Sequence, residues 1–105
     1  MIDWTQMQTP AAREAEVMAG RMAAAQAECR RRILAVVPET TQMNLTAAAA
    51  ANVLSPADRA TFAAGLGWIA AMRAAWPAIA AAGIAPEAAT WPGVPAGVEA
   101  LARRF

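Results

Sequence analysis

The stretch SPADRATFAAGLGWIAAMRAAW, residues 55–76, decides the fold, because it opens with helix-start signals and continues with an apolar stripe. Ser55 can cap the helix, Pro56 can take the first position, where no N–H is needed, and Asp58 stands where a capping box places an acid. Apolar side chains then recur at helical spacing, which predicts one buried face: Phe62, Leu66, Ile69, Met72 and Trp76.

A longer helix is predicted before this stretch, over residues 10–37, after an irregular leader at residues 1–9. Thr9 is the expected N-cap and Pro10 the first helical residue. Pro38 is expected to end the helix or at least to kink it, because a proline within a helix removes a hydrogen bond and clashes with the preceding turn. Its seam is built largely of small residues: Ala11, Ala15, Met18, Met22, Ala25, Cys29 and Val36. Such a seam stabilises a helix poorly by burial alone, so this helix is a candidate oligomerisation segment.

The remaining residues, 38–105, are predicted to form a small helical domain. A helix over residues 39–54 and the helix from Ser55 onward would form a helical hairpin. The first of these helices is expected to bury Met43, Ala47, Ala50 and Leu54.

The end of the chain is predicted from its prolines and glycines. Pro77 is expected to break or kink the helix at Trp76, and Gly83 to end any turns beyond it. Gly65 and Gly67 indicate a close approach of a neighbouring helix. A loop over residues 84–95 leads to a short helix that starts at Pro95 and turns two side chains inward, Val98 and Leu101.

These segments define an all-α fold: a long N-terminal helix, a helical hairpin and a short C-terminal helix. Alanine, the strongest helix former, makes up about a third of the 105 residues, which agrees with that class.

The net charge of +1 argues against a nucleic-acid or anionic-lipid partner, because it provides no strong electrostatic field. Three consecutive arginines, Arg30 to Arg32, are only a weak phosphate-binding footprint. The two helices that meet at a tight join near Ser55 are interpreted as a plain helical hairpin and not as a DNA-binding helix-turn-helix. The apolar run at residues 62–85 contains Arg73 and Pro77, and an arginine at the centre of a bilayer costs about 2.5–3.5 kcal/mol. We therefore expect no membrane span, with Arg73 at the margin of the stripe.

Catalysis is not expected, because the chain has no histidine, no paired carboxylates, no Gly-rich phosphate loop and no metal-ligand spacing. The single cysteine, Cys29, lies on the apolar side of a helix, where a small buried hydrophobe is the ordinary role. No catalytic residue, cofactor, metal or small-molecule substrate is predicted.

Five residues are candidates for contact with another protein: Trp4, Met18, Met22, Cys29 and Trp91. Met18, Met22 and Cys29 lie on the seam of the long helix. Trp4 and Trp91 are expected in loops, where each could mark a partner surface or cover a small core.

Several segments resemble the small tail fibre, tail-associated and tail fibre assembly proteins of tailed phages and prophages. The start MIDWTQMQTPAAREAEVMAGRMAAAQAECRRRI resembles their short leader and Ala/Glu/Arg-rich helix, and GLGWIAAMRAA resembles a later part. The most specific match is the ending WPGVPAGVEALARRF, with a W-P-x-x-P-x-x-V-x-A-L pattern from Trp91 to Leu101.

The resemblance implies a virion tail component that is assembled in the host cytoplasm and acts by contact with other tail proteins. It also allows a homo-oligomer, including a trimer, because tail fibre parts are often trimeric. Two other functions stay open: a tail fibre assembly chaperone that is absent from the mature virion, and a small phage-encoded inhibitor or regulator that binds a host protein.

Overall fold

The computed structural model describes residues 9–105, and this part of the chain contains helices and connecting segments without a strand. Its elements are α1 (Pro10–Val36), α2 (Glu39–Ala50), α3 (Pro56–Ala82), the short 3₁₀ helix η2 (Pro86–Ala88) and α4 (Val98–Arg103). The predicted all-α class is therefore confirmed. Most of the predicted leader, including Trp4, lies outside the described residues.

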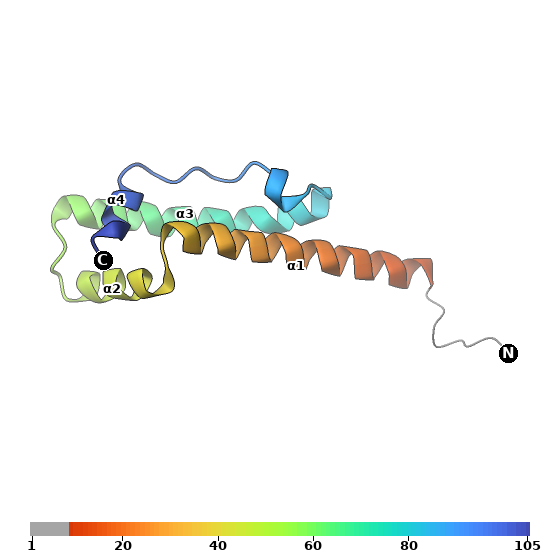
Figure 1. The fold of residues 1–105 in the computed structure, drawn as a ribbon, viewed down its shortest axis with the longest axis horizontal. Coiled ribbons are helices and arrows are strands. Elements are labelled where there is room, and N and C mark those ends of the chain that lie inside the picture. Colours follow the sequence, from red (N-terminus) through yellow and green to blue (C-terminus); the bar gives the residue numbers. More distant parts are fainter. Residues whose placement is uncertain (1–8) are drawn as a thin grey trace.

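The two long helices, α1 and α3, run antiparallel and pack against each other (Figure 1). α2 folds back beneath the end at which α1 finishes and α3 begins, and α4 packs against both α3 and α2 at that end. The segment between η2 and α4 runs back along the pair of long helices. α1 extends beyond the end of α3, so its first turns project from the body of the molecule (Figure 1).

Both long helices begin at the predicted caps. The Thr9 hydroxyl accepts a hydrogen bond from the Ala12 amide at 3.1 Å, and the Ser55 hydroxyl accepts one from the Asp58 amide at 3.1 Å. Each cap is followed by a proline, Pro10 or Pro56, in the first helical turn. These starts were predictable because a cap and the proline after it act within a few residues of each other.

Of the predicted break or kink at Trp76, the break does not occur, because α3 continues through Pro77 to Ala82. A proline removes one backbone hydrogen bond, but the turns after it are held by burial of Ile79 and Ala80. Gly83 then ends the helix in the left-handed conformation, with φ 68°, as predicted.

One hydrophobic core joins all four α-helices at the end of the molecule where α1 finishes and α3 begins, which we call the closed end. Its buried members are Cys29, Ile33 and Val37 from α1 and the residue after it, Leu45 from α2, Trp68, Ile69 and Met72 from α3, and Val98, Leu101 and Ala102 from α4. The inward positions of Ile69, Met72, Val98 and Leu101 are confirmed, whereas Trp68 was not predicted.

The predicted buried face of α2 is wrong. Met43 is 71% exposed, Ala47 and Ala50 are also exposed, and the helix buries Leu45 and Ala48 instead. Leu54 is buried as expected, but it lies in the join after α2. The stripe was misplaced because an alanine-rich helix has little difference in hydrophobicity around its circumference, and the packing of α4 decides which side faces inward.

The predicted close approach at the paired glycines holds for one of them. A Cβ added at Gly65 would lie 3.6 Å from a Val98 methyl, so α4 crosses α3 closely there. A Cβ added at Gly67 would meet nothing within 4 Å.

Two glycine-to-alanine substitutions should therefore change stability in opposite directions. Gly67→Ala is expected to raise the free energy of unfolding by about 0.5–1 kcal/mol, because alanine favours the helical conformation more than glycine does. The added methyl group would contact no other residue, since nothing lies within 4 Å of it. Gly83→Ala should lower it by about 1–2 kcal/mol, because φ 68° disfavours any Cβ. Urea unfolding followed by circular dichroism measures both, and equal effects of the same sign would contradict this account.

Candidate protein interface

The first half of α1 is uncovered by the rest of the described chain. Every residue from Pro10 to Ala24 is exposed, and the first buried residue of the helix is Ala25. α3 ends level with Arg21, because a Cβ added at Gly83 would lie 3.4 Å from the Arg21 guanidinium. The eleven residues before Arg21 correspond to about 16 Å of helix.

The side of α1 that packs against α3 continues into this uncovered half. Glu14, Met18 and Arg21 follow one another at steps of four and three before Ala25, so they lie on the side of the helix that later becomes buried. Met22 flanks the same side. On this side, one methionine stands between two charged residues, and the rest of the described chain does not cover it.

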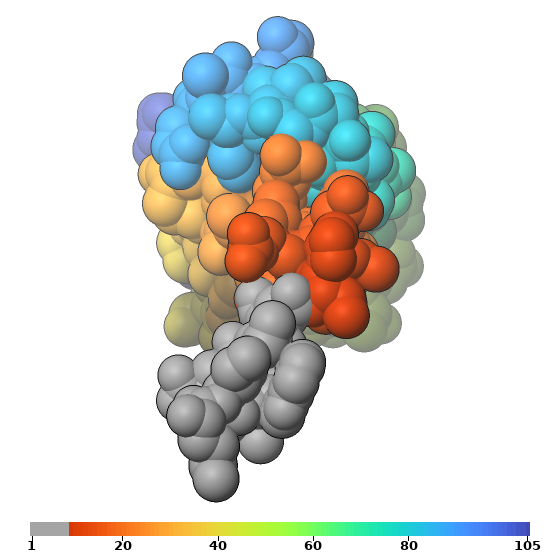
Figure 2. Space-filling view, turned by 90° about the vertical axis from the view of Figure 1, so that its right-hand side faces the viewer, coloured from red at the N-terminus to blue at the C-terminus, as the bar shows by residue number. Residues whose placement is uncertain are grey.

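Three large apolar side chains are exposed on this segment: Val17 at 49%, Met18 at 36% and Met22 at 42%. Methionine side chains are flexible and polarisable, which suits contact with another protein surface. Figure 2 views the molecule from this end, with the first turns of α1 in front and the end of α3 above them. We call residues Pro10–Met22 the open half of α1.

The predicted interface residues Met18 and Met22 both lie in the open half of α1. Glu14, Val17 and Arg21 line the same surface as Met18 but were not among the predicted residues. Glu14 and Arg21 lie at helical spacing from Met18 and Ala25, so the sequence could have indicated both. They were missed because the search for a seam counted only apolar residues.

Cys29 is not part of an exposed interface. Its side chain is 3% exposed and belongs to the core. Burial raises the pKa of the Cys29 thiol, against a smaller opposing effect of the Arg73 charge. The thiol is therefore held in its neutral form, in agreement with the predicted role of a small buried hydrophobe.

Trp91 covers the core instead of standing free. Its indole is half-buried and packs against the core, and its N–H donates to the Pro86 carbonyl oxygen at 2.9 Å. The Arg32 guanidinium lies 5.4 Å from the centre of the Trp91 ring, in cation–π geometry. Of the two roles considered for Trp91, the structure supports the lid.

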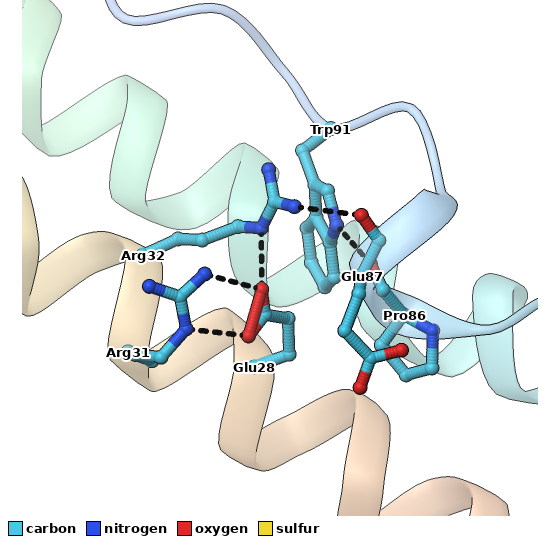
Figure 3. Close-up of polar contacts among 6 residues, drawn as sticks. All are labelled: Glu28, Arg31, Arg32, Pro86, Glu87 and Trp91. Atoms are coloured by element: carbon cyan, nitrogen blue, oxygen red, sulfur yellow. Dashed lines mark hydrogen bonds and ion pairs between the residues drawn. The ribbon is translucent and has the colours of Figure 1, made fainter.

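Arg32 joins this lid to α1, and Glu28 holds the Arg32 side chain in place (Figure 3). The Glu28 carboxylate, only 8% exposed, accepts hydrogen bonds from Arg31 at 2.6 and 2.7 Å and from Arg32 at 2.9 Å. Arg32 also donates to the Glu87 carbonyl oxygen at 3.4 Å. The group links α1 to the segment that follows α3, so its role is structural.

The two arginines lower the pKa of the Glu28 carboxyl from its ordinary value of 4.5 to about 2. Hydrogen bonds from Arg31 contribute most, burial opposes them, and hydrogen bonds from Arg32 add to the lowering. Glu28 is therefore ionised at neutral pH despite its burial.

A smaller apolar surface lies between α2 and α3. Leu66 was predicted to be buried but is 52% exposed, beside a hollow of about 60 Å³ to which Leu45, Phe62 and Ile69 also contribute. The stripe on α3 is rotated because the larger Trp68 occupies the core. This hollow is too small for a protein side chain larger than a few atoms.

Residues 9–105 contain no group of three or more His, Cys, Asp or Glu side chains placed to hold a metal ion. In the same range, no helix combines the length and the apolar character that crossing a bilayer requires. Every buried side-chain nitrogen and oxygen in the described part has a hydrogen-bond partner.

These observations define a small helical protein in which the first half of α1 is uncovered by the rest of the described chain. Comparison with protein-family models, with curated protein sequences and with solved structures gave no match.

Proposed function

We propose that this protein acts by protein–protein contact through the open half of α1, as a structural component of a phage tail. The observation that carries the proposal is the uncovered continuation of the α1–α3 packing face, with Met18 and Met22 on it. Three large apolar side chains exposed on one helix segment and flanked by charged residues are typical of a surface that meets a partner.

The tail component is the more specific part of the proposal and depends on the sequence resemblance. Its most specific stretch, from Trp91 to Leu101, folds onto the core through Trp91, Val98 and Leu101. In this proposal that ending secures the closed end of the molecule, and the open half of α1 remains available to other tail proteins. The protein would then reside in the virion tail after assembly in the host cytoplasm, without catalysis.

Mass spectrometry of purified virions tests the tail assignment. Presence of the chain in stoichiometric amounts would support a structural component. Absence from virions together with binding to an unassembled tail fibre would identify an assembly chaperone instead. Absence from both, with specific binding to one host protein, would overturn the tail assignment in favour of an inhibitor or regulator.

Replacing both open-half methionines by glutamate should abolish incorporation of the chain into tails. Met18→Glu with Met22→Glu places two charges on the proposed contact but should leave the fold intact, since neither side chain belongs to the hydrophobic core and glutamate favours helix. We expect the affinity for the partner to fall at least about a hundredfold. Quantitative mass spectrometry of virions produced with the variant measures the loss.

A matched control is Met43→Glu, because Met43 is 71% exposed on α2, away from the open half of α1. The control should be incorporated as the wild-type chain is. Normal incorporation of the double variant would show that the partner contacts another surface.

A further inference from the structure

We propose that α2 is a flap over the apolar side of α3 and that α4 is the latch that keeps this flap closed. The flap opens while the α1–α3 pair stays folded, and loosening the latch makes it open more often. The inference concerns the closed end of the molecule, so it depends neither on the open half of α1 nor on the tail assignment.

The first argument is that α2 has little hold on the two long helices. It packs mainly against α4, and its direct contact with α1 and α3 is sparse. Of its twelve residues, only Leu45 and Ala48 are buried. A segment with few buried apolar contacts opens at a lower free energy than the rest of a protein, so α2 should open locally.

The contact between α2 and α3 is also incompletely packed. A hollow of about 60 Å³ lies between the two helices. Its lining includes two residues of α2 and three of α3: Leu45 and Thr46, and Phe62, Leu66 and Ile69. Because the hollow remains and Leu66 stays 52% exposed beside it, α2 covers the apolar side of α3 without packing closely into it.

The polar ties between α2 and the end of α1 lie in the first turn of α2. Glu39 forms an ion pair with Arg30, but both side chains are about two-thirds exposed, so this pair contributes little. The Gln42 side-chain amide donates to the Val37 carbonyl oxygen at 2.8 Å, in the short join before α2. These contacts hold the start of the helix and leave the rest of it free to move.

The join after α2 has its own contacts. Asn52 takes the left-handed conformation, with φ 59°, and its side-chain oxygen accepts a hydrogen bond from Arg59 at 2.9 Å. Leu54 in the same join is buried. These contacts fix the join and not the helix before it, so the two joins are the hinges of the flap.

The latch ties α2 to α3 through the end of α4. The Arg104 guanidinium donates two hydrogen bonds to the Asp58 carboxylate in the first turn of α3, at 3.1 and 3.0 Å. On the other side, the Asn44 side-chain amide of α2 donates to the backbone oxygen of Phe105 at 3.0 Å. α4 also packs directly against α1 and α3 (Figure 1). The dependence therefore has one direction: α2 needs α4, but α4 has its own hold on the long helices.

Hydrogen–deuterium exchange of the full chain tests the proposal. In the wild-type chain, the amides of α2 should be less protected than those of α3 between residues 62 and 79. Arg104→Ala should lower the protection of α2 about fivefold and leave that part of α3 unchanged. Arg104 forms its ion pair with α3 and not with α2, so a loss of protection in α2 must pass through α4.

Two matched variants act as controls. Arg103→Ala removes the neighbouring arginine, which pairs with Glu99 of the same helix at 3.7 Å, so it should leave α2 unchanged. Ala47→Gly weakens α2 itself at an exposed position. It should lower the protection of α2 about fivefold without lowering that of α4, because α4 keeps its contacts with α1 and α3.

Circular dichroism must show that Arg104→Ala keeps its helical fold. If it does not, Arg104→Lys takes its place, because lysine keeps the charge but loses the paired hydrogen bonds, and a smaller loss of protection in α2 is expected.

Three results would overturn the proposal. The first is an α2 as well protected as the interior of α3 in the wild-type chain. The second is a latch variant that leaves α2 unchanged or exposes α2 and α3 equally. The third is an Ala47→Gly variant that exposes α4 as much as α2, because the two helices would then open as one unit and α4 would not be the latch.

Discussion

Replacing Trp68 by alanine is expected to lower the free energy of unfolding by about 3–5 kcal/mol, a large part of the total for a domain of this size. Trp68 is 5% exposed and lies in the core beside Ile69 and Met72. Its removal leaves a cavity that the surrounding side chains cannot refill completely. It also leaves the Pro92 carbonyl oxygen without the indole N–H that donates to it at 3.0 Å.

Two control variants separate these contributions. Trp68→Phe keeps most of the apolar volume but loses the hydrogen bond, so it should cost about 1–2 kcal/mol. Leu66→Ala, on the same helix but 52% exposed, should cost less than about 1 kcal/mol. Urea unfolding followed by circular dichroism measures all three, and a Trp68→Ala loss no larger than that of Leu66→Ala would refute the assignment of Trp68 to the core.

Glu28→Gln is expected to lower the free energy of unfolding at neutral pH by about 2 kcal/mol. The substitution keeps the shape of the side chain but removes the charge that pairs with Arg31 and Arg32. The loss stays below that of a fully buried ion pair because the Arg31 side chain is 65% exposed and remains hydrated. The segment from η2 onward should exchange its amide hydrogens faster in the variant, because Arg32 also contacts Glu87 and Trp91.

The effect of Glu28 should depend on pH in a defined direction. Its pKa in the folded protein, about 2, is below its ordinary value of 4.5, so folding favours the ionised carboxylate. The contribution is therefore complete above the ordinary value and is lost as the pH falls through the range between the two values. The stability difference between wild type and Glu28→Gln should shrink to less than half at about pH 3.

Measuring that difference at a series of pH values isolates Glu28, because the other carboxyl groups titrate alike in both proteins. Chemical unfolding of the two chains at matched ionic strength is sufficient. A difference that stays constant from neutral pH to about pH 3 would show that the Glu28 carboxylate is not selectively stabilised in the fold.

The ends of the helices could be predicted because their signals are local. Thr9 with Pro10 and Ser55 with Pro56 start the two long helices, and Pro38 and Gly83 end them, each acting within about one turn. Pro77 was the exception, because it sits within a helix whose later turns are buried against α1. Local backbone chemistry disfavoured the continuation of α3, and tertiary packing outweighed it.

The candidate site was predictable only in part. Met18 and Met22 were predicted as contact residues from their spacing, and both are exposed on the open half of α1. Cys29 follows the same seam but is buried, because the seam passes from solvent to core where α3 begins to cover α1. No periodicity within α1 shows that position, since it depends on where a different helix ends.

The amino-acid sequence by itself determined the all-α class, the limits of the long helices and the apolar seam of α1. Only the tertiary structure decided which sides of α2 and α3 are buried, that Trp91 is a lid held by Arg32, and that half of the seam stays uncovered. The physical reason is the abundance of alanine: its small side chain specifies helix strongly but distinguishes one side of a helix from another weakly. The few large side chains, such as Leu45 and Trp68, therefore set the packing through contacts between segments that are distant in the sequence.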